Sequence, residues 1–206
     1  MGLYNIFFNE FGRLRSGWRL GLYIFALIAL WILLESGVRL VYAVGHTLVP
    51  NSPYVGYAAN LGYRLVILGA GLGAGYFCAR FLERLPWRSL GLTLHDGWVR
   101  DLIIGSAIGF AALALAVGIA TVAGGLRFSF VRSELLLVTL RSLISSSVLM
   151  FVAALAEEAA FRGYPLQTLS RAKLVVFGVL ITSLPFGLVH LMNPNVVPGA
   201  TLVNTA

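Results

Sequence analysis

The sequence predicts an all-α protein, a polytopic transmembrane helical bundle with about five spans. Hydrophobic residues make up 59% of the 206 residues and charged residues only 11%, whereas soluble domains contain about 25% charged residues. Apolar runs near the roughly 20 residues needed to cross a bilayer recur along the chain. Charged residues are too few to form the polar surface of a soluble domain. A soluble fold is therefore excluded.

The apolar runs define the expected spans, which in chain order are residues 20–44, 60–82, 99–123, 135–156 and 173–192. Turn-forming residues separate them: V-P-N-S-P-Y follows the first run, Pro86 ends the second and Gly124-Gly125 follows the third. The first run is long and lacks an A-x-A-like cleavage site, so we interpret it as a retained anchor rather than a signal peptide.

Lys and Arg residues in the short connections predict the orientation. They concentrate before the first span, between the second and third spans, and after the fourth: Arg13, Arg15, Arg19, Arg80, Arg84, Arg88, Arg100, Arg162, Arg171 and Lys173. We therefore expect an integral protein of a prokaryotic plasma membrane with its N-terminus in the cytoplasm. The same arginines explain the net charge of +7 as contacts with the lipid bilayer, without a nucleic-acid partner.

Three charged residues follow directly on the fourth apolar run, in the segment A-L-A-E-E-A-A-F-R-G-Y. On a helix Glu158 and Arg162 share a face, while Glu157 points roughly 100° away. An ion pair between Glu158 and Arg162 would fix the local structure and leave Glu157 free to handle a proton. The alternative is that all three are ordinary charges at a helix end near the membrane surface.

A second polar residue lies in the next apolar segment, L-P-F-G-L-V-H-L-M-N-P. Phe186 and His190 are four residues apart on one helical face, and Pro185 can open or bend the backbone. Taken alone, His190 is more often a satisfied core residue or a partner in a hydrogen bond between helices. Taken together, the two segments are far more specific than either one.

E-E-x-x-x-R followed within about one membrane crossing by F-x-x-x-H resembles the CAAX-protease and bacteriocin-processing (CPBP) family of intramembrane endopeptidases, also called the Abi family. The likeness includes Phe161-Arg162-Gly163 and covers residues 98–206, after an N-terminal transmembrane region at residues 1–97. The resemblance implies peptide-bond hydrolysis in a peptide or prenylated protein substrate. It does not indicate an oligomeric state.

The resemblance also assigns roles to single residues. Glu157 would activate the attacking water and His190 would hold or polarise it, with Glu158 and Arg162 as the supporting pair and Phe186 packing the site. The family's third motif, a His followed four residues later by Asn or Asp, does not occur in the 16 residues after His190. We therefore expect this chain to be a family member that is cut short within a further helix, which begins near Leu202. We also expect the chain to be inactive as a protease by itself, unless Asn193 or Asn195 completes the site.

No cofactor is required by this interpretation. Zinc is an alternative activator, but there is no H-E-x-x-H motif, and Glu157 with His190 gives fewer than the three protein ligands usual for catalytic zinc. The metal requirement is therefore left open. Two rival classes are a proton-relay transporter, which should show repeat symmetry or paired broken helices, and a catalytically silent membrane binding or immunity protein of the same fold.

The predicted spans create a problem of depth. If the fourth span ends at Ala156, Glu157 lies near the cytoplasmic surface, whereas His190 lies about 25 Å from that surface along a straight fifth helix. The two residues can meet only if the fourth helix continues past Glu157, or if the fifth begins later and turns near Pro185.

Overall fold

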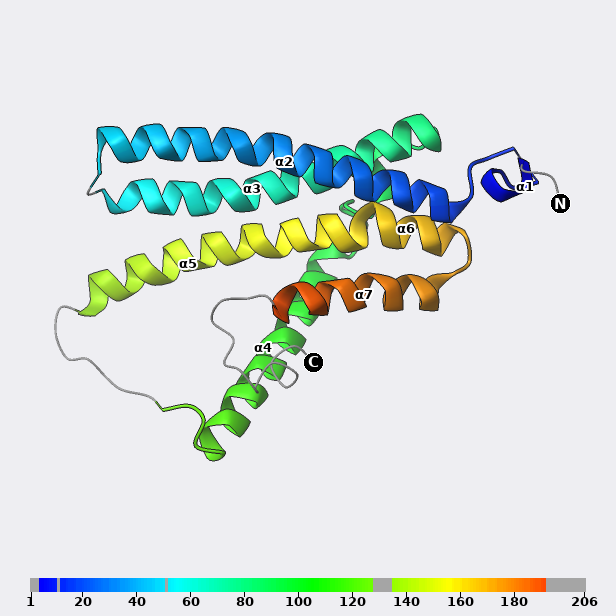
Figure 1. Cartoon of the computed structure of the whole chain (residues 1–206). Helices are drawn as coiled ribbons and strands as arrows, with labels where there is room; N and C mark the ends of the chain where they lie inside the picture. Colours follow the sequence, from blue (N-terminus) through cyan, green and yellow to red (C-terminus); the bar gives the residue numbers. More distant parts are fainter. Residues whose placement is uncertain (1–3, 11, 51, 128–134, 192–206) are drawn as a thin grey trace. The chain divides into compact units, whose positions relative to one another are not determined.

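The computed structural model describes residues 4–10, 12–50, 52–127 and 135–191, and its regular elements in these ranges are helices (Figure 1). In chain order they are α1 (Tyr4–Phe7), α2 (Ser16–Leu48), α3 (Pro53–Phe77), η1 (Cys78–Leu82), η2 (Trp87–Leu90), α4 (Trp98–Val122), α5 (Leu135–Glu157), η3 (Glu158–Gly163), α6 (Tyr164–Arg171) and α7 (Val175–Leu191). The predicted all-α bundle is confirmed. The helix expected near Leu202, together with Met192, Asn193 and Asn195, lies outside the described residues.

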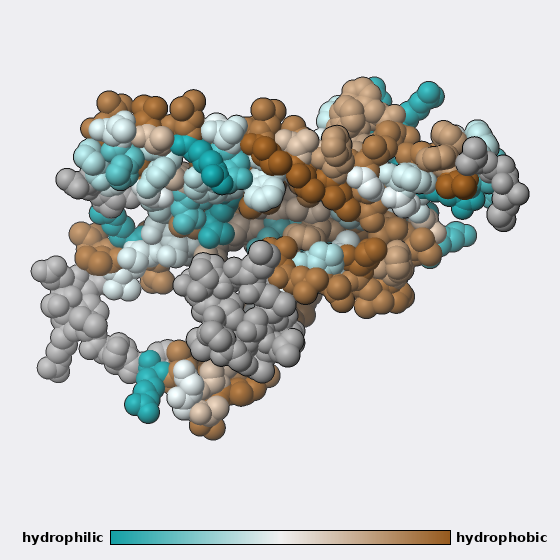
Figure 2. Space-filling model, in the orientation of Figure 1, coloured by the Kyte–Doolittle hydropathy of each residue, from teal (hydrophilic) through white to brown (hydrophobic). Residues whose placement is uncertain are grey.

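Four helical stretches are long and apolar enough to cross a membrane: Ser16–Leu48, Tyr54–Leu82, Trp98–Val122 and Leu136–Arg171, and a shorter apolar helix covers Val175–His190. Large apolar side chains lie exposed along these helices, including Phe25 and Leu48 of α2 and Val176 of α7. Hydrophobic residues, in brown, cover much of the face drawn in Figure 2. Exposed apolar surface of this extent suits lipid rather than water. The chain is an integral membrane protein.

Two compact units divide the chain, one formed by Met1–Leu92 with Ser146–Ala206 and the other by Thr93–Ser145. The second contains α4, which has no buried residue. The first contains both motif segments and is the unit that positions the candidate site. The division between residues 97 and 98 stays a prediction.

Helices α2 and α3 form an antiparallel hairpin in which small residues let the backbones approach. A Cβ placed on Gly45 would lie 3.4 Å from Val55, and one placed on Gly62 would lie 3.1 Å from Val38. Glycine removes the side chain that would otherwise hold the helices apart. Helix α3 begins at Pro53, earlier than predicted, because proline is well suited to the first turn of a helix.

The prediction that the fourth span ends at Ala156, with Arg162 in a connection, is wrong. Helix α5 passes directly into the π-helix η3 and then into α6, so the helical path continues to Arg171. Charged residues commonly mark the end of a membrane-spanning helix, but here a widened helical turn carries the chain past them. Arg162 is therefore a helical residue.

The continued helix removes the problem of depth. Glu157 lies fourteen residues before Arg171, which is about 21 Å of helix, and His190 lies fifteen residues after Val175, which is about 22 Å. Both distances are measured from the same turn between α6 and α7, so the two residues come to the same level. Pro185 lies inside α7 and does not end it.

Candidate active site

The candidate site lies where the end of α5 and the π-helix η3 face the end of α7. Helices α6 and α7 pack closely, since a Cβ placed on Gly178 would lie 3.1 Å from side-chain atoms of Leu166 and Leu169. Lys173, in a left-handed backbone conformation with φ of 61°, reverses the chain between the two helices. This α-helical hairpin brings the two sequence motifs together.

Glu157 and His190 face one another across the hairpin. Glu157 Oε1 lies 3.8 Å from His190 Nε2, and the side chains are 41% and 40% exposed. His190 Nδ1 lies 2.9 Å from the Phe186 carbonyl oxygen. A carbonyl can only accept, so Nδ1 carries the hydrogen, and in the neutral ring Nε2 is then the acceptor. The free face of the imidazole is directed to Glu157.

Glu158 forms an ion pair with Arg162, which leaves Glu157 as the acid beside the histidine. Arg162 also lies over the Phe186 ring, with its guanidinium carbon 5.8 Å from the ring centroid. Phe186 contacts Phe161 edge to face at 5.6 Å and His190 at 4.5 Å between ring centroids. The structure thus brings together all five residues selected from the sequence, with Phe186 packing between the two motifs.

Tyr23 of α2 holds the backbone of the π-helix, and its role was missed from the sequence. Its hydroxyl donates to the carbonyl of Ala160 at 2.8 Å and lies 3.4 Å from that of Ala159. The side chain is 1% exposed, and its ring stacks on Tyr164 with centroids 5.3 Å apart. A tyrosine in an apolar run gave no signal, since its partners are backbone atoms from a distant segment.

Gly71 of α3 lets the π-helix approach from another side. A Cβ on Gly71 would lie 3.1 Å from the Ala160 backbone nitrogen and 3.3 Å from the Ala159 carbonyl carbon. Real Cβ atoms are seldom this close to a backbone, so only glycine fits without movement. The two residues that begin the π-helix after Glu158 are therefore fixed by α2 and α3 together.

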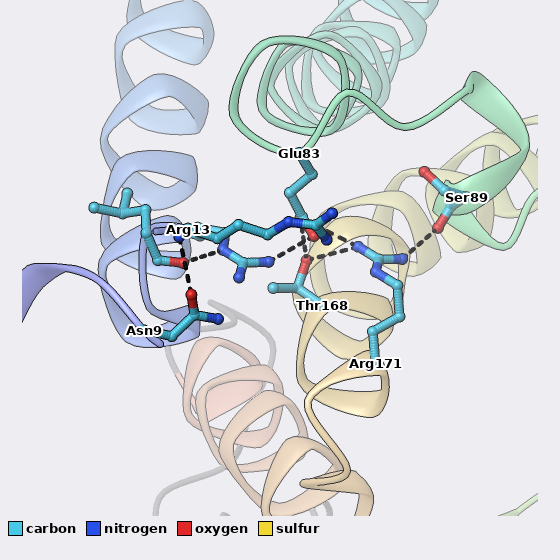
Figure 3. Close-up of polar contacts among 8 residues, drawn as sticks. Asn9, Arg13, Glu83, Ser89, Thr168 and Arg171 are labelled. Carbon is cyan, nitrogen blue, oxygen red and sulfur yellow. Dashed lines mark hydrogen bonds and ion pairs between the residues drawn. The ribbon is translucent and has the colours of Figure 1, made fainter. Parts of the chain in front are cut away.

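A second polar cluster, which sequence reasoning also missed, lies near the end of α6 (Figure 3). Glu83 is only 8% exposed; its carboxylate lies 2.6 Å from Arg19 and 3.3 Å from Arg171, and it accepts a hydrogen bond from Thr168 at 3.3 Å. Arg171 also donates to the Ser89 carbonyl at 3.0 Å. The only sequence signal was a single acid among arginines in R-F-L-E-R-L-P-W-R. The cluster joins α2, the end of η1, η2 and α6.

No group of three or more His, Cys, Asp or Glu side chains suited to a metal ion occurs in the part of the chain that the structure describes. Glu157 and His190 would supply two ligands, and a catalytic zinc normally has three from the protein.

Replacing Arg162 by Met is expected to lower both thermal stability and activity. The substitution leaves the Glu158 carboxylate without its partner in a helical stretch apolar enough to cross a membrane, so the charge is poorly compensated. Adding Glu158→Gln should restore most of the thermal midpoint, measured in detergent by the loss of helical circular dichroism. A double variant no more stable than Arg162→Met would contradict the pairing.

Comparisons with known proteins give one family match. Residues 138–206 match the family model described as type II CAAX prenyl endopeptidase Rce1-like. That region is about a third of the chain and contains Glu157, Glu158, Arg162, Phe186 and His190. No curated protein and no solved structure matches the chain. The C-terminal third of this chain is thus similar to the type II CAAX prenyl endopeptidase Rce1-like family, which confirms the resemblance to the CAAX-protease and bacteriocin-processing family.

Proposed function

We propose that this chain is an intramembrane endopeptidase of the CAAX-processing or bacteriocin-processing type, which hydrolyses a peptide bond with a water activated by Glu157. The observation that carries the proposal is the approach of Glu157 to His190 at 3.8 Å, inside the region that matches the endopeptidase family. Both side chains are partly exposed, so a substrate and a water can reach them.

Glu157 acts as the general base. Water attacks poorly at neutral pH until a base takes its proton, and a positioned carboxylate is a common group for this task. As the water oxygen bonds to the scissile carbonyl carbon, its proton passes to Glu157. When the carbon–nitrogen bond breaks, that proton is delivered to the leaving amine, which returns Glu157 to its ionised form.

His190 orients the water or stabilises the oxyanion, depending on its protonation. With Nδ1 donating to the Phe186 carbonyl, neutral His190 offers Nε2 as an acceptor for one water proton. A protonated ring instead offers an Nε2–H donor to the developing oxyanion. Neither role needs a metal ion, and the proposal assigns none.

The test of this function is cleavage of a membrane-tethered or prenylated peptide by the purified protein in ¹⁸O-labelled water. Hydrolysis should place one ¹⁸O atom in the new carboxyl group of the N-terminal product, detected by mass spectrometry. Products without ¹⁸O, or no cleavage by a folded protein that contains the complete family motif set, would count against a water-based endopeptidase.

We further propose that the N-terminus is cytoplasmic, as the arginine distribution predicts. Cys78 is the only cysteine and is 1% exposed, so single cysteines can be introduced at Thr47 and Arg88 in a Cys78→Ala background. Both positions are exposed and lie at opposite ends of the α2–α3 hairpin. In intact cells a membrane-impermeant maleimide should label position 47 and spare position 88. The reverse pattern would invert the topology.

A further inference from the structure

Pro165 gives a physical reason for the π-helix. In an unbroken α-helix the N–H of residue 165 would bond to the Phe161 carbonyl, and the proline ring would clash with that carbonyl. Widening the helix into η3, directly before the proline, avoids the clash. In π-helical spacing the partner of residue 165 is the carbonyl of Ala160, which Pro165 cannot satisfy. Tyr23 donates to that carbonyl.

The π-helix also decides which acid faces α7. Leu169 marks the face of α6 that packs on α7, because it lies against Gly178. Eleven residues make about three turns of α-helix, so in an unbroken helix Glu158 would lie in line with Leu169. A π-helical turn holds about one residue more than an α-helical turn. The acid in line with Leu169 is therefore Glu157.

The observed contacts follow this register. Glu157 lies against His190, whereas Glu158 pairs with Arg162 along its own helix. In an α-helical register Glu158 would face α7 instead, and Glu157 would point roughly 100° away from it. The position of Glu157 at the site is thus a property of one helical turn and not of α5 alone.

We propose that Tyr23 and Pro165 are positioning residues that select Glu157, rather than Glu158, as the acid facing His190. Pro165 disfavours the α-helical register, and the buried Tyr23 hydroxyl supplies the hydrogen bond that the π-helical register lacks. The inference rests on the proposed function only where it takes the acid that faces His190 as the catalytic base. Which of the two acids faces His190 does not depend on that function.

The experiment measures register without catalysis. In the full chain with Cys78→Ala, cysteine pairs are placed at positions 157 and 190 or at positions 158 and 190, and each is treated in membrane vesicles with a short bifunctional thiol reagent. The 157–190 product should predominate over the 158–190 product. Each pair is then combined with Pro165→Ala, which restores the missing N–H, with Tyr23→Phe, or with both.

We expect each single substitution to shift the product ratio toward 158–190 by roughly five- to tenfold, as one buried hydrogen bond would, and the combination to shift it further. Tyr42→Phe, on the same helix α2, serves as the control and should leave the ratio unchanged. Pro165→Ala keeps the test independent of any loss of stability caused by Tyr23→Phe.

A ratio that equals the parent ratio in Pro165→Ala and in Tyr23→Phe would overturn the proposal. An equal loss of both products in Tyr23→Phe would assign that residue a stabilising role only and would also overturn its part in the selection. Neither result bears on whether the protein cleaves peptides, and failure of the ¹⁸O assay would leave the cross-linking ratio as it is.

Discussion

In a full-length parent that carries the complete family motif set, Glu157→Gln is expected to lower the rate of proteolysis by about 100- to 10,000-fold, the usual contribution of a general base. Glutamine has the shape of glutamate but cannot take a proton from water. The distance of 3.8 Å to His190 is too long for a direct hydrogen bond, so the substitution removes no close contact there. The thermal midpoint and helical circular dichroism should therefore match those of the parent protein.

Glu158→Gln is the matched control, because it makes the same change on the adjacent residue. It breaks the pair with Arg162 but leaves the acid beside His190, so its effect on kcat should be much smaller than that of Glu157→Gln. Initial rates of peptide cleavage should be compared at equal amounts of folded protein. Activity of Glu157→Gln equal to the parent would remove Glu157 as the base.

Gly71→Val is expected to destabilise the protein by about 1–3 kcal/mol, as overpacking of a well-packed interior does. Its Cβ would fall 3.1 Å from the Ala160 nitrogen, and backbone atoms cannot rotate away as a flexible side chain can. The π-helix must then shift away from α3, which displaces Glu157 from His190. Misplacement by about 1 Å can cost on the order of 100-fold in rate. The rate of cleavage should therefore fall even at temperatures where the variant is still folded.

Gly56→Val on the same helix is the control for this prediction. A Cβ at Gly56 meets no atom within 4 Å, so the change in helix propensity is the same but there is no clash. Thermal midpoints and initial rates should be measured for both variants in the same detergent. If Gly71→Val were as stable and as active as Gly56→Val, close packing of α3 on η3 would not matter to the site.

The sequence allowed the fold and the choice of candidate residues to be predicted, because both depend on short-range patterns. Apolar runs of membrane length define the helices, and the spacing of four between Glu158 and Arg162 places these residues on one helical face. The ion pair between them is present. The catalytic roles assigned to Glu157 and His190 stay predictions.

The support of the site could not be predicted, because it depends on contacts between distant segments. Tyr23 and the carbonyl of Ala160 are 137 positions apart, and an acceptor on the backbone leaves no trace in side-chain patterns. The prediction that the fourth span ends at Ala156 is wrong for a related reason, because local sequence does not report distant contacts. Local charge suggests a helix end, whereas the chain continues through a widened helical turn in which the Ala160 carbonyl accepts a hydrogen bond from the distant Tyr23.

The cluster around Glu83 implies an order of assembly. Arg19 and Glu83 are 64 positions apart and both belong to the first hairpin, whereas Arg171 lies a further 88 positions along the chain. During synthesis the hairpin can therefore close with one ion pair long before α6 emerges. Glu83, already paired with Arg19, then offers α6 one negatively charged position that Arg171 can contact. Arg171, which is synthesised last, would then fix the position of α6 against this hairpin.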